Sequence, residues 1–240
     1  KPGQKKEKVL GLVSPHAGYI YSGNVAGAVF SRAALTKTVI VIGPNHRGAG
    51  ASFAVMVDGA WNMPWGDTNI NKRLADLLIA QSAWLTADDR AHMYEHSVEV
   101  QLPFVHHTRP DFEFVPIVAG WADFVVCEEI GLDIAKAIRG YGEPVVIIAS
   151  TDMTHYESQE SAKRKDQLAI DRILALDPAG LLDTVTRNNI SMCGVIPTAI
   201  TLAAAKELGA AKAHLVDYAT SGDVSGDFSQ VVGYAGFIIQ

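Results

Sequence analysis

Histidines follow short apolar segments at three places in this chain. His16 comes after residues 9–13, His46 after residues 38–42 and His155 after residues 145–149, each across a short turn of small or polar residues. Imidazole nitrogen binds iron, copper and zinc, and a histidine also transfers protons near neutral pH. The alternative for each is a hydrogen-bonded loop residue. The repeated pattern favours a metal site, and we predict that one metal ion is bound by His16 and His46.

A cysteine and an acidic segment add further candidate side chains. Cys193 precedes an expected helix, whose N-terminus favours the thiolate form that binds metals, although a lone cysteine is often only a small buried side chain. Glu95, His96 and Glu99 lie within five residues, so they either line a polar pocket or belong to a solvated helix start. Cys127 lies in an apolar helical pattern and is expected to be buried.

The remaining histidines have no comparable setting. We expect them at the surface or at helix ends; they are His92, His106, His107 and His214. Trp61 and Trp65 either flank a substrate entrance or anchor a loop by packing, which is the commoner role of such residues. The chain has no HExxH or CxxC motif, so these zinc signatures are absent.

Composition restricts the class of protein. The 240 residues are 48% hydrophobic and carry a formal net charge of −6, which fits a single domain over residues 1–240. There is no basic stripe for nucleic acid and no apolar run of the roughly 20 residues that a membrane span needs. Two cysteines cannot form a disulfide framework, and we expect a cytoplasmic protein.

Apolar segments alternate with helical patterns along the chain. We expect strands at residues 9–13, 38–42, 112–118, 145–149, 214–218 and 231–239. We expect helices at residues 24–34, 70–80, 98–107, 125–138, 159–176 and 197–208. Pro116 inside its segment predicts a sheet edge or a bulge. This order predicts an α/β fold with a mixed or mostly parallel central sheet, in which ligands bind beyond the carboxyl ends of the strands.

Six segments together resemble the Memo family, known in bacteria and archaea as AmmeMemoRadiSam system protein B. They are SPHAGYIYSG (14–23), VIGPNH (41–46), EHSVEVQLPF (95–104), IIASTDMTHY (147–156), CGVIPTAI (193–200) and TSGDVSGDFSQVVGYAG (220–236). They occur in order over nearly the whole chain, so the resemblance is specific. It implies a single domain, with helices flanking the sheet, similar to the class III extradiol dioxygenases.

The resemblance also implies roles for individual residues. The metal ligands would be His16, His46 and Cys193, with the cysteine in place of the carboxylate that the dioxygenases use. His155 would be the acid/base histidine and Asp152 an orienting group. The expected wall of the substrate pocket consists of Glu95, His96, Tyr19 and Asn45.

The implied activity is that of a non-haem-iron oxidoreductase acting on a small, phenolic substrate. Iron(II) is favoured, but a thiolate ligand also suits copper or zinc. Two alternatives stay open: a metal-assisted hydrolase without redox chemistry, and a ligand- or peptide-binding protein of the signalling type with an enzyme-derived pocket. The family name further suggests a pathway shared with a radical-SAM protein.

Overall fold

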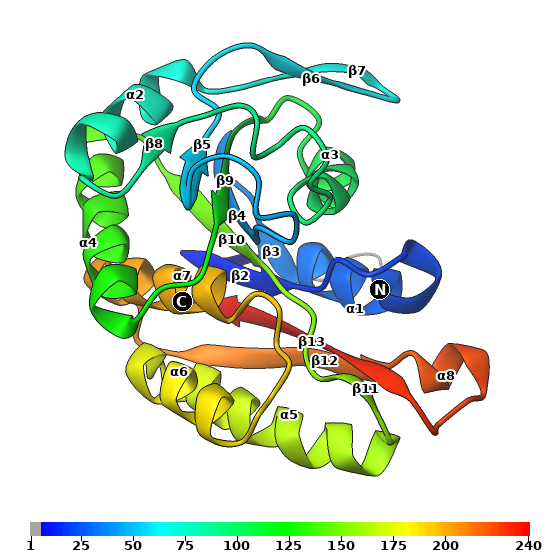
Figure 1. Cartoon of the computed structure of the whole chain (residues 1–240). Helices are drawn as coiled ribbons and strands as arrows, with labels where there is room; N and C mark the ends of the chain where they lie inside the picture. Colours follow the sequence, from blue (N-terminus) through cyan, green and yellow to red (C-terminus); the bar gives the residue numbers. More distant parts are fainter. Residues whose placement is uncertain (1–5) are drawn as a thin grey trace.

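The computed structural model describes residues 6–240 and is built around one large β-sheet (Figure 1). The strands are β1 (Glu7–Lys8), β2 (Gly11–Ser14), β3 (Ala33–Ala34), β4 (Thr38–Pro44), β5 (Phe53–Val55), β6 (Ala60–Met63), β7 (Gly66–Asn69), β8 (Thr86–Ala87), β9 (Glu113–Ala119), β10 (Val145–Ser150), β11 (His155–Glu157), β12 (Ala213–Thr220) and β13 (Val231–Ile239). The helices are α1 (Tyr19–Arg32), α2 (Lys72–Gln81), the 3-10 helix η1 (Glu99–Gln101), α3 (Leu102–Thr108), α4 (Phe124–Tyr141), α5 (Gln159–Leu174), α6 (Pro178–Arg187), α7 (Val195–Glu207) and α8 (Gly222–Ser225).

The large sheet has nine strands and mixed direction. Its order is β11-β13-β2-β10-β4-β9-β5-β8, and β12 pairs with β13 beside this path. The four central strands β2, β10, β4 and β9 run parallel to one another. On either side β13 and β5 run antiparallel to them. The expected α/β fold with a mixed, largely parallel sheet is therefore confirmed.

Helices cover both faces of the central strands. Ile40 and Ile42 of β4 pack in a core with α2, α4 and α7, whereas Val39 and Val41 pack in a second core with α1 and α3. Successive side chains of a strand point to opposite faces, so a strand covered on both sides is apolar throughout. A third core lies between β13 and the helices α5, α6 and α7.

The structure corrects several expectations about individual elements. β9, which contains Pro116, is not at an edge, since it lies between β4 and β5. The ladder with β5 stops at Ile117, so Pro116 lies just past its end, where a missing N–H is tolerated. Residues 95 and 96 have no regular structure and residues 97 and 98 form a turn before η1, so Glu95 does not belong to a helix start.

Other elements lie outside the expected ranges. α1 begins at Tyr19, five residues earlier than expected, and α6 follows α5 as a separate helix capped by Asp177. The hairpin β6–β7 has no apolar alternation to signal it. Within the described residues, no helix combines the length and apolar character that a membrane crossing requires.

Candidate metal centre

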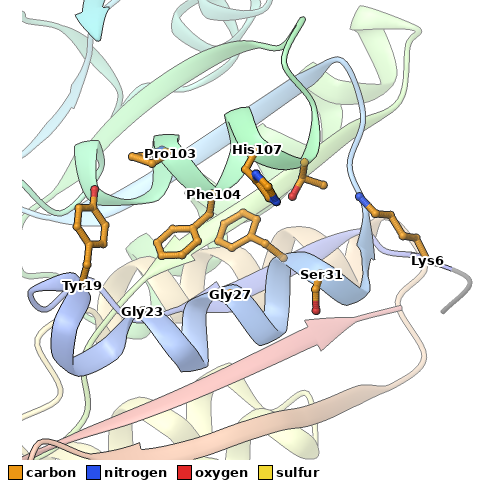
Figure 2. Close-up of a pocket in the computed structure, with 10 residues that line it drawn as sticks. Lys6, Tyr19, Gly23, Gly27, Ser31, Pro103, Phe104 and His107 are labelled. Carbon is orange, nitrogen blue, oxygen red and sulfur yellow. The ribbon is translucent and has the colours of Figure 1, made fainter. Parts of the chain in front are cut away.

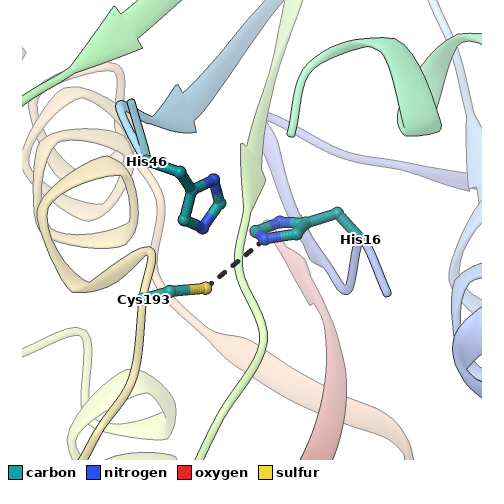
Figure 3. A group of neighbouring side chains, drawn as sticks. All are labelled: His16, His46 and Cys193. Atoms are coloured by element: carbon teal, nitrogen blue, oxygen red, sulfur yellow. Dashed lines mark hydrogen bonds between the residues drawn. The ribbon is translucent and has the colours of Figure 1, made fainter. Parts of the chain in front are cut away.

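The predicted ligands meet at the carboxyl ends of three neighbouring parallel strands. His16 follows β2 by two residues and His46 follows β4 by two, while β10 lies between these strands. Cys193 precedes α7, which packs on the same strands. Figure 3 shows the three side chains pointing toward one another. One ligand atom from each lies within 4.8 Å of the others, so the structure brings the predicted set together.

A hydrogen-bond chain fixes the tautomer of His16. The Ser150 hydroxyl donates to Ser97 O at 2.6 Å and accepts from Gln101 Nε2 at 2.8 Å. Its single hydrogen is thus used, so His16 Nδ1 at 2.9 Å must be the donor. Nε2 of His16 keeps its lone pair and lies 3.4 Å from Cys193 Sγ (Figure 3).

Burial keeps His16 neutral. The ring is 2% exposed, and burial, with the nearby His46 and His96, lowers the pKa of His16 to about 3. Neutral imidazole is the form that binds a metal. His16 is therefore ready to act as a ligand at neutral pH without losing a proton.

Glu95 holds the ring of His46 as Ser150 holds the ring of His16, but the Glu95 carboxylate carries a negative charge. Its carboxylate accepts from His46 N at 2.7 Å and from His46 Nδ1 at 2.9 Å, and also from the backbone of His96 and Ser97. Burial alone would raise the pKa of Glu95, but these bonds outweigh it and hold the pKa at about 2. The carboxylate fixes the Nδ1–H tautomer, which leaves Nε2 of His46 free for a metal.

The Glu95 side chain is buried and does not face an open pocket. Its side chain is 1% exposed and lies behind His46, so it supports a ligand. His96, by contrast, is 54% exposed and stacks on His46, with ring centroids 5.0 Å apart. Glu95, His46 and His96 also form a second group with metal-ligand spacing. Because Glu95 already accepts four hydrogen bonds, we interpret this group as support for the first.

Cys193 is a thiol as long as no cation is beside it. Burial, and then Asp152, raises the pKa of Cys193 to about 12. In the metal-free protein, desolvation therefore outweighs the favourable effect expected of the helix N-terminus. A metal ion would reverse the balance, because a coordinating thiol loses its proton.

Asp152 connects the loops that carry His16 and Cys193. Its Oδ1 accepts from His16 N at 2.9 Å and from Ala17 N at 3.3 Å, while its own N–H donates to Cys193 Sγ at 3.2 Å. Burial raises the pKa of Asp152, and the bonds from His16 and Ala17 oppose that shift. Asp152 therefore orients the His16 loop through its side chain and Cys193 through its backbone N–H.

His155 is held by Ser191 and has one ring nitrogen free. Ser191 Oγ accepts from His155 N at 2.7 Å, and Ser191 O lies 2.9 Å from His155 Nδ1. A carbonyl oxygen can only accept, so Nδ1 carries the hydrogen and Nε2 is a base. Among residues 6–240, no group bonds to Nε2. This arrangement suits acceptance of a substrate proton.

Tyr19 and Asn45 have contacts of their own. The Tyr19 ring packs edge-on against Phe104 at 5.8 Å and lines a groove of about 660 Å³ between α1 and α3 (Figure 2). The amide of Asn45 donates to Ala49 O at 2.9 Å and so closes its own loop. The structure thus places Tyr19 in this groove and Asn45 in the turn before His46.

The structure also shows where the tryptophans and the other candidate residues lie. Trp61 packs against Phe114 and Trp65 stacks on His106, so both anchor the β6–β7 hairpin, as the packing alternative expects. Cys127 is fully buried, as expected. His92 is 7% exposed, which corrects its expected place at the surface.

Sequence reasoning missed the residues that support the ligands. Ser150 and Gln101 orient His16, and Thr151 accepts from Gly194 N at 2.9 Å, which holds the turn after Cys193. Ser150 and Thr151 follow directly from the β10 segment, and Gln101 follows Glu95 in the acidic segment. Their proximity to these candidates was the available signal, but polar side chains next to a site are too common to single out.

The donor set fits a single mononuclear metal. Two imidazoles and one thiol converge, and each histidine has a hydrogen-bond partner at its other ring nitrogen. That second contact is typical of metal-binding histidines. His16, His46 and Cys193 would therefore hold the ion.

Known proteins resemble this chain over nearly its whole length. The model of the Memo-like protein family matches residues 1–238. A MEMO1 family protein of Methanopyrus kandleri is 45% identical over 234 residues, covering 96% of this chain and 83% of that protein. MEMO1 family proteins of Methanosarcina mazei and Methanocaldococcus jannaschii are 43% and 42% identical, with 98% of this chain covered in each and 88% and 85% of those proteins.

A solved structure supports the fold. An uncharacterized protein from Escherichia coli K12 superposes with a TM-score of 0.63, covering 95% of this chain and 98% of that chain at 12% identity. That likeness concerns the fold alone. The family match over nearly the whole chain and relatives above 40% identity show that this chain belongs to the Memo-like family.

Proposed function

We propose that this protein is a metal-dependent oxidoreductase of the extradiol-dioxygenase type that acts on a small phenolic substrate. The convergence of His16, His46 and Cys193 within 4.8 Å carries the proposal. Iron(II) is the favoured ion, and when bound it would supply Lewis acidity and a redox-active centre through which electrons pass from the substrate to dioxygen.

The residues around the ligands support a proton-transfer step. His155 presents Nε2 as a base because Nδ1–H is committed to Ser191 O. It would take the proton of a substrate hydroxyl and later return it. Asp152 keeps the His16 and Cys193 loops together during that exchange. Glu95 keeps its charge behind His46 and makes that ligand more basic.

The test is oxygen uptake by protein reconstituted with iron(II) in the absence of air. We expect uptake with at least one member of a panel of catechols when air is admitted. His46→Ala should lose both iron and uptake. His155→Gln should keep the iron and lose most of the uptake, because the base is gone but the ligands remain. Absence of uptake across the panel, with iron shown to be bound, would overturn the proposal.

A second candidate is a metal-assisted hydrolase, and the thiolate ligand favours it. Sulfur is a softer ligand than the carboxylate of the dioxygenases, so zinc competes better with iron at Cys193. This alternative expects zinc to copurify with the protein and ester turnover to proceed without oxygen. Turnover that stops when oxygen is removed would exclude it.

A further inference from the structure

Tyr156 has a backbone conformation that bulky residues rarely adopt. Its φ is +57°, in the left-handed region, where the Cβ crowds the following carbonyl oxygen. Among the described residues, two other non-glycine residues, Leu176 and Asn189, share a positive φ. Asparagine tolerates this region, and Leu176 is 7% exposed and gains from burial in a core. Tyr156 is 72% exposed, so the fold gains little from its side chain.

The strain arises from an irregularity in the sheet beside the candidate metal centre. β11 pairs with β13 through His155 and Glu157, and the register shifts between them. The residue between, Tyr156, is left out of the ladder. Such bulges redirect side chains next to functional sites. Here the bulge puts the Tyr156 ring beside the His155 ring, with centroids 5.8 Å apart and planes at 65°.

We propose that Tyr156 binds a planar apolar group that extends from the metal-binding head of the substrate past His155. The inference rests on the proposed function and narrows it to a class, phenolic compounds that carry a second aromatic ring. Tyrosine faces stack on such rings, and a fixed left-handed backbone aims the side chain before the substrate arrives.

The experiment compares two probes, catechol and 4-phenylcatechol, on zinc-loaded protein. Zinc is redox-silent, so binding is measured by calorimetry without turnover. We expect wild-type protein to bind 4-phenylcatechol at least about tenfold more tightly than catechol, corresponding to about 1.4 kcal/mol. Tyr156→Ala should bring the ratio of the two dissociation constants close to one, and Tyr156→Phe should preserve the wild-type ratio. Trp84→Ala, which removes an exposed aromatic residue elsewhere, is the matched control and should leave the ratio unchanged.

Tyr156→Gly separates binding from folding. Glycine adopts a positive φ without strain, so this variant should keep or raise the melting temperature while losing the preference for the aryl probe. A lower melting temperature with an unchanged ratio would show that Tyr156 serves the fold and would overturn the inference. If both probes bind equally in wild-type protein, the inference is wrong and the proposed function is unaffected. If zinc is bound and neither probe binds, the proposal of a phenolic substrate is wrong, and so is the inference that rests on it.

Discussion

At the scale of single residues, His16 and His46 differ in the charge of their second partner. His16 donates to a neutral hydroxyl, whereas His46 donates to a carboxylate that keeps its charge. A carboxylate partner raises the basicity of an imidazole ligand and fixes its ring. The two ligands should therefore contribute unequally to metal affinity, with His46 depending strongly on Glu95.

Glu95→Gln tests this dependence. The amide still fills the space but carries no charge, so metal affinity should fall by about 10- to 100-fold. Competition with a chelator of known affinity measures the change. Glu99→Gln, which changes an exposed carboxylate four residues away, should leave the affinity unaltered. Equal affinities in the Glu95 variant and in wild-type protein would contradict the role that we assign to Glu95.

Cys193 makes metal binding depend on pH. Because its pKa is about 12 in the metal-free protein, the thiol must release a proton when it becomes a ligand. We expect about one proton released per ion between pH 7 and 8.5, and affinity that rises about tenfold per pH unit. Calorimetry in buffers of different ionisation enthalpy counts the protons. Cys193→Ala should release none from this position, and a wild-type count of zero would remove Cys193 from the ligand set.

His92 should make the folded state sensitive to acid. Burial lowers the pKa of His92 to about 4, and Asp89 opposes the shift without reversing it. The unfolded chain, with an ordinary pKa near 6.5, binds the proton first as pH falls, so stability is full above about pH 6.5 and declines toward pH 4. The loss reaches roughly 3 kcal/mol at most. Urea titrations at several pH values should show a flatter profile for His92→Gln, and an unchanged profile would exclude His92 as the cause.

At the scale of elements, the site depends on loops that leave three parallel strands at the same sheet edge. The apolar segments and the turns after them were predictable, because strand ends carry ligands in such sheets. The pairing order β2-β10-β4 was not, since it depends on long-range packing of strands with nearly identical apolar composition. The prediction of an edge position for Pro116 was wrong for that reason, because the local sequence does not encode how far the partner strand β5 extends.

Gly194 shows how closely these elements approach. A Cβ at this position would clash with Ser150 O and the Thr151 side chain, so the turn before α7 lies directly on the end of β10. Gly194→Ala should push Cys193 away from His16 and weaken metal binding by more than tenfold, with a lower melting temperature. Gly140→Ala, at a helix position with open space around it, is the matched control and should bind metal normally. Normal binding in the Gly194 variant would show that the turn tolerates displacement.

At the scale of the whole molecule, the ligand set joins distant parts of the chain. Residues 16, 46 and 193 approach only when the central sheet and α7 are assembled. The unfolded chain holds no such set, so a metal ion binds the folded state selectively. Free zinc at 100 times its dissociation constant should stabilise the protein by about 2.7 kcal/mol. Calorimetric melting should show a rise with zinc that His16→Ala abolishes, and equal shifts in both proteins would indicate binding elsewhere.

The hydrogen bonds around Asp152, Glu95 and Ser150 also bear on how fast an ion enters. They hold the donor atoms together before any ion arrives, so entry needs no rearrangement of the sheet or of its loops. The slow step is then the loss of water from the ion itself. Stopped-flow mixing should accordingly rank copper and zinc ahead of nickel, in the order in which these ions exchange water. The pace of loading would thus be set by the chemistry of the ion.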